Sequence, residues 1–92
     1  MELFTVAVAG TDIVLNASWN DIDVIFPDGS KETIADAYAD SEYKLTGKIM
    51  NMIAFDNDEK FDEIQESVWN AVGECFSWER DAYFDWEEGG RE

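Results

Sequence analysis

Hydrophobic and polar residues alternate along the first part of the chain in three short runs. The runs cover residues 3–9, 13–19 and 22–26. Short turn sequences end them, at residues 10–12, 20–21 and 27–29. In the second and third runs one face is apolar and consists of Ile13, Leu15, Ala17, Trp19, Ile22, Val24 and Phe26. This alternation predicts a three-stranded antiparallel meander that buries one face.

The middle of the chain carries weaker patterns. Ser30 is a favourable N-cap residue, and Ile34 and Tyr38 lie one helical turn apart, so we expect a short helix over residues 31–39. The alternation in residues 48–55 favours a fourth strand. A helix is the alternative for that segment.

The strongest helical signal lies between residues 58 and 78. Apolar residues recur there at helical spacing and form one stripe with aromatic edges: Phe61, Ile64, Val68, Trp69, Val72, Cys75 and Phe76. Asp56 or Asn57 would cap this helix. Because Glu79 would fall inside the apolar stripe, we expect the helix to end or bend near Trp78 or Glu79.

These elements predict an α+β fold in a single domain, residues 1–92. A small antiparallel sheet of three to four strands would pack against one long acidic helix and a short helix. Residues 79–92 would form an acidic, aromatic tail, partly disordered at 88–92. A hydrophobic fraction of 46 %, with 14 % aromatic residues, is too high for a disordered acidic chain, so the chain is expected to fold.

The charge balance limits the possible chemistry. The chain has 22 Asp and Glu, 6 Lys and Arg and no His, which gives a net charge of -16. With no His and only Cys75, it cannot form a Cys/His zinc site, a Ser-His-Asp triad or a disulfide framework. We therefore expect no catalysis, no metal and no cofactor, and we expect Cys75 to pack in the core. Direct binding to nucleic acid would be repulsive, so the expected partner is basic.

The acidic residues concentrate in the second part of the chain, where residues 56–92 carry 13 acids and 3 bases. A helical projection places five of them in an arc of roughly 120° opposite the apolar stripe: Glu59, Asp62, Glu63, Glu66 and Glu74. Carboxylates three or four residues apart are about 4.5 to 6 Å apart along the axis, and duplex phosphates advance about 3.4 Å per strand. This face, extended by Asp81 and Asp85, is predicted to imitate phosphates. The alternative is an acidic interaction module or a salt-adapted protein, whose charge serves solubility.

Four aromatic residues of the second part have two interpretations: Trp69, Trp78, Phe84 and Trp86. They could complete the small core, or they could form a dimer interface, because aromatic residues are enriched at interface centres. The N-terminal region has no basic segment followed by a long apolar one, so we expect neither a signal peptide nor a membrane span. The expected location is the cytoplasm.

The chain resembles the small phage DNA-mimic anti-restriction proteins in length, charge and order of elements, from Met1-Glu2-Leu3-Phe4 to the Trp-rich tail. The shared features are a short, acidic, His-free chain with strands first and the acidic helix late. The resemblance implies a homodimeric, non-catalytic inhibitor of host defence. Its target would be a DNA-binding host protein, either a McrBC-type restriction nuclease or an H-NS-like nucleoid protein. No family motif carries over residue by residue, so the site residues rest on the helical projection.

Overall fold

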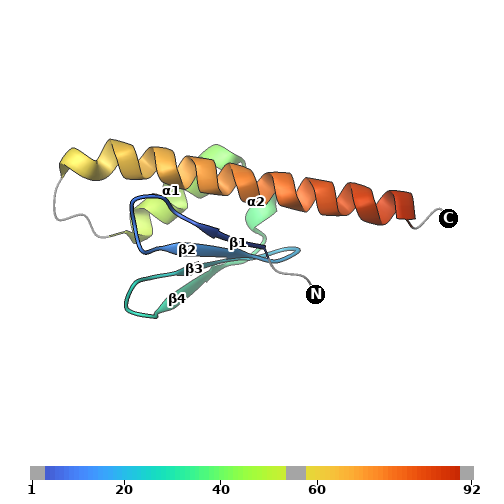
Figure 1. Cartoon of the computed structure of the whole chain (residues 1–92), viewed down its shortest axis with the longest axis horizontal. Helices are drawn as coiled ribbons and strands as arrows, with labels where there is room; N and C mark the ends of the chain where they lie inside the picture. The colour runs from blue at the N-terminus through green and yellow to red at the C-terminus, as the bar shows by residue number, and fades with distance from the viewer. Residues whose placement is uncertain (1–3, 54–57, 90–92) are drawn as a thin grey trace.

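The computed structural model describes residues 4–53 and 58–89, and only the backbone of residues 58 and 82–89. Within these residues an antiparallel sheet has the strand order β1-β2-β3-β4 (Figure 1). The strands are β1 (Phe4–Ala7), β2 (Val14–Ala17), β3 (Ile22–Ile25) and β4 (Lys31–Ile34). The predicted meander and the α+β class are confirmed, because each strand follows its neighbour through a short turn.

The predicted helix over residues 31–39 is wrong. β4 occupies its first half, and a single 3-10 turn, η1 (Ala37–Ala39), follows. Ser30 caps no helix, because its N–H and its hydroxyl both donate to the carboxylate of Asp28, within the turn that leads into β4. Gly29 gives this turn its positive φ of 88°. The sheet then pairs Ile34 with Ile22, which buries Ile34 in the core.

The predicted fourth strand at residues 48–55 is also wrong, and the helical alternative is right. Residues 48–52 belong to α1 (Glu42–Met52), whose N-cap Ser41 accepts a hydrogen bond from the backbone N–H of Lys44. The buried residues of α1 follow a helical period: Leu45, Thr46, Ile49 and Met50. Half of that stripe precedes residue 48, so the shorter segment showed only an apparent alternation. Residues 54–57, with the proposed caps Asp56 and Asn57, lie outside the described residues.

The long helix continues beyond its predicted end. After a 3-10 turn, η2 (Asp58–Lys60), helix α2 runs from Phe61 to Gly89. Figure 1 shows that α2 crosses the sheet and then extends past it toward the C-terminus. The sheet no longer lies beneath this last part, so a charged residue in the stripe need not be buried there. Accordingly, Glu79 is only half-buried and the helix does not end at it.

The core lies between one face of the sheet and the two helices. The sheet and both helices contribute fully buried residues to it, among them Leu15, Ala17, Ile22, Val24, Leu45, Ile49, Val68, Val72 and Cys75. The inward faces predicted for the second and third runs are therefore confirmed at Leu15, Ala17, Ile22 and Val24. Trp19 differs, because 39 % of its side chain is exposed at the end of the sheet.

Gly47 weakens α1 without an evident packing reason. A Cβ at this position would meet no atom within 4 Å, so alanine fits in the helix. Replacing an interior helical glycine by alanine is worth roughly 0.5–1 kcal/mol. We expect Gly47→Ala to raise the free energy of unfolding in urea by about that amount. The control is Gly10→Ala, which also meets nothing within 4 Å but has φ +77°, and which should lower the free energy instead.

Candidate functional site

The exposed side of α2 carries the acidic residues that the helical projection grouped. Five of them are exposed along this helix, and we call them the acidic face: Asp62, Glu63, Glu66, Glu74 and Asp81. They point away from the sheet because Val68, Val72 and Cys75 on the opposite side of the helix fill the core. Glu59 is exposed just before the helix, and the side chain of Asp85 lies outside the described residues.

The acidic face is long and unevenly spaced. A rise of 1.5 Å per residue places Asp62 and Asp81 about 28 Å apart along the axis. Asp62, Glu63 and Glu66 lie within little more than one turn, whereas about 12 Å separates Glu66 from Glu74. Even the spacing of about 4.5 to 6 Å along the axis between carboxylates one turn apart is wider than the roughly 3.4 Å between phosphates of one DNA strand. The helix can therefore match some phosphate positions along a duplex edge, and not each one.

No ion pair to the acidic face is found within the part of the chain that the structure describes. Among the described residues, ion pairs join Lys31 with Asp23 and Lys48 with Asp40, and none involves a carboxylate of α2. The sequence of α2 contains nine acidic residues and one basic residue, Arg80. An uncompensated row of charges produces a field that attracts cations and cationic side chains.

The structure places two of the four aromatic residues of the second part of the chain. Trp78 stacks on Phe4 with ring centroids 5.7 Å apart and planes 11° apart, and it lies 5.7 Å from Trp19. Trp78 therefore closes the end of the core where α2 crosses β1. Trp69 stays outside the core with 43 % of its side chain exposed. The side chains of Phe84 and Trp86 lie outside the described residues.

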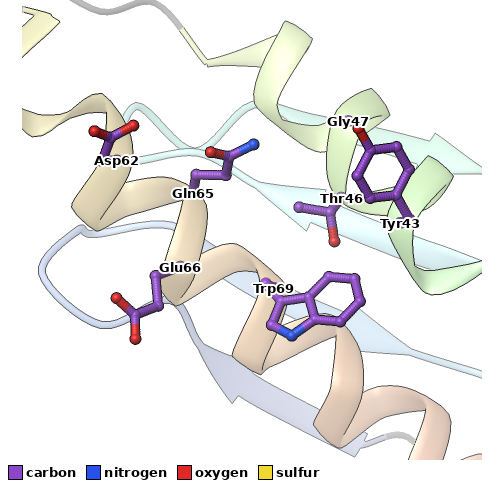
Figure 2. Close-up of a pocket in the computed structure, with 7 residues that line it drawn as sticks. All are labelled: Tyr43, Thr46, Gly47, Asp62, Gln65, Glu66 and Trp69. Atoms are coloured by element: carbon purple, nitrogen blue, oxygen red, sulfur yellow. The ribbon is translucent and has the colours of Figure 1, made fainter.

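A groove of about 430 Å³ lies between α1 and α2, beside the acidic face (Figure 2). It is lined by Tyr43, Thr46, Gly47, Asp62, Gln65, Glu66 and Trp69. Tyr43 is 77 % exposed and was not singled out from the sequence. Tyr43 and Gly47 are four residues apart and therefore lie on the same face of a helix. The sequence would have grouped them only if residues 42–52 had been recognised as a helix.

Cys75 is a buried, free thiol. Burial is the larger cause, and the negative charge of Glu74 the smaller, of a rise in the pKa of this thiol from 9.0 to about 12. Only the thiolate is a good nucleophile, so we expect thiol reagents at pH 8 to modify Cys75 at least a hundredfold more slowly, by order of magnitude, in the folded than in the urea-unfolded protein. Rapid reaction of the folded protein with Ellman's reagent would contradict this arrangement.

The same shift predicts a pH dependence of stability. The thiol of Cys75 ionises near 9.0 in the unfolded chain and about 12 in the folded one. The stability that this shift contributes is therefore fully present below pH 9 and is lost as pH rises toward 12. The reason is that the thiol of the unfolded state loses its proton at a lower pH than the thiol of the folded state, which favours unfolding. Cys75→Ala should show a smaller loss of stability over that window in urea titrations.

The described residues were also searched for a metal site and for a membrane-spanning helix. Among residues 4–53 and 59–81, no three acidic or thiol side chains are grouped so that they could hold a metal ion. No helix in the described part of the chain is long and apolar enough to cross a membrane.

Comparisons with protein-family models, with curated proteins and with solved structures find no match to this chain.

Proposed function

We propose that this protein is a DNA mimic that presents its acidic face to the DNA-binding surface of a basic host protein and blocks DNA binding there. The observation that supports this proposal is the row of exposed carboxylates along a single long helix, without ion pairs among the described residues of that helix. Such a row costs stability through self-repulsion, and helices normally reduce that cost with Lys or Arg one turn away. An external cationic surface would supply the missing partners.

The proposed mechanism is competition for the same Lys and Arg side chains that bind phosphates. The helix holds its carboxylates in fixed relative positions, so little ordering is needed on binding. Complementary charge should speed association, and the affinity should fall steeply with salt. No chemical step is involved. A restriction nuclease or a nucleoid protein of the host cytoplasm fits this role, and a homodimer would enlarge the acidic surface; both parts rest on the family resemblance.

The test is capture of a partner from bacterial lysate on the immobilised protein at low and at moderate salt. A captured DNA-binding protein should be released by excess duplex DNA, and much less by poly-glutamate at the same charge concentration. Retention of the partner in the presence of duplex DNA would contradict mimicry and favour the acidic interaction module. Equal release by both polyanions would show that charge alone governs binding.

A further inference from the structure

We propose that the groove between α1 and α2 is an arginine-binding site, which holds the guanidinium group of one arginine side chain from the basic partner. This inference rests on the proposed function only for the source of that arginine. The groove lies at the edge of the acidic face and shares Asp62 and Glu66 with it. It would therefore add a binding site selective for one kind of side chain to a surface that otherwise attracts cations of any kind.

The first argument is that two aromatic rings in the groove have no ring partner among the described residues. Within that part of the chain, ring contacts join Phe4 with Trp78, Trp19 with Trp78, and Tyr38 with Phe76. Tyr43 and Trp69 take part in none of these contacts. Figure 2 shows their rings at the same end of the groove, one from each helix, with Thr46 between them. Exposed rings of this kind can accept a cation over their faces.

The second argument is the negative charge along the rest of the groove. Asp62, Glu66 and Trp69 follow one another at about one-turn intervals on the same side of α2. In Figure 2 Asp62 lies at the end of the groove opposite the rings, so we expect it to act through its field. The carboxylate of Glu66 points away from the rings, so it would act through its field or after a change of rotamer. The amide of Gln65 points toward Thr46 and adds a polar group to the wall.

These features favour arginine over other occupants. A guanidinium is planar, stacks on aromatic rings and donates up to five hydrogen bonds, whereas the ammonium of lysine is compact and strongly hydrated. A second copy of this chain seated in the groove would bring its own acidic charge against Asp62 and Glu66 and would be repelled there, so a homodimer would have to form through another surface. Gly47 keeps the groove open, because the space that a Cβ would face there holds no atom within 4 Å.

The test compares two fluorescently labelled peptides of equal length and charge, one rich in arginine and one in lysine, by anisotropy titration of the full chain. The arginine peptide should bind more tightly. Tyr43→Ala and Trp69→Ala should each weaken it by about threefold to tenfold and should affect the lysine peptide less. Gly47→Leu, which fills the groove and improves the helix, should reduce the same preference in a stable protein.

A charge-matched pair of variants separates the groove from the general field. The double variant Asp62→Asn with Glu66→Gln should lower the preference for the arginine peptide. The double variant Glu63→Gln with Glu74→Gln should lower the affinity for both peptides by the same factor. Equal affinity for the two peptides, or an unchanged preference in Tyr43→Ala, Trp69→Ala and Gly47→Leu, would overturn the assignment. Loss of self-association in Trp69→Ala would also overturn it, because a second copy would then occupy the groove. Duplex DNA competition in lysate tests the proposed function separately, so the two can fail independently.

Discussion

Reversing two charges of the acidic face, Glu63→Lys with Glu74→Lys, should weaken binding of the DNA-displaceable partner by about a hundredfold. Each reversal replaces an attraction by a repulsion at a position where the proposal places a Lys or Arg, and about 1.4 kcal/mol per position corresponds to a factor of ten each. Both positions lie outside the groove between α1 and α2. Titration of the purified partner at two salt concentrations measures the loss and shows whether it shrinks at high salt.

The matched control reverses the same number of charges away from the long helix. Asp12 and Glu32 are located in the turn after β1 and in β4, so Asp12→Lys with Glu32→Lys alters the net charge equally. We expect less than a tenfold effect from it, because only the overall field changes. Equal losses in the two double variants would mean that net charge, and not the acidic face, determines binding. Circular dichroism and urea unfolding verify that all variants fold.

Removing the indole of Trp78 should produce the largest loss of stability among the aromatic positions of α2. Trp78 stacks on Phe4 and approaches Trp19, so Trp78→Ala leaves a space between the helix and the end of the sheet. Trp to Ala changes at buried positions cost about 3–5 kcal/mol, and Trp78 is partly buried, so we expect a loss near the lower end of that range. A folded domain has only about 5–15 kcal/mol in total. Urea unfolding should show a midpoint shifted to a much lower concentration.

Trp69→Ala is the comparison for that result. Its side chain is 43 % exposed and outside the core, so the expected cost is about 1 kcal/mol or less. Light scattering on both variants measures the oligomeric state at the same time. A small effect of Trp78→Ala on stability, together with dissociation of a dimer, would identify Trp78 as an interface residue and contradict its place in the core.

The acidic face and the buried stripe of α2 could be predicted together from the sequence. Both follow from one helical period, which requires only that the helix exists and that its apolar side finds a core. The exposure of Glu63 and Glu74 and the burial of Val68 and Val72 agree with that projection. What the projection could not provide is the relation of this helix to α1, and hence the groove with Tyr43.

The amino-acid sequence alone specifies the elements whose pattern is local and repeated. Alternation with a period of two and strong turn residues define β1 to β3, and a long period of 3.6 defines α2 as far as Trp78. The net charge and the lack of His likewise exclude whole classes of site, because these properties depend on composition and not on how the chain folds.

Tertiary contacts determine the segments with mixed local signals. Residues 31–34 form β4 because pairing with β3 buries Ile34, a non-local gain that outweighs a weak helical preference. Residues 42–52 form α1 because Leu45 and Ile49 reach the same core as α2. Beyond Trp78 the helix leaves the sheet, so the rule that ended it at Glu79 does not apply there. In each case the deciding contact joins residues far apart in the chain, which a local pattern does not contain.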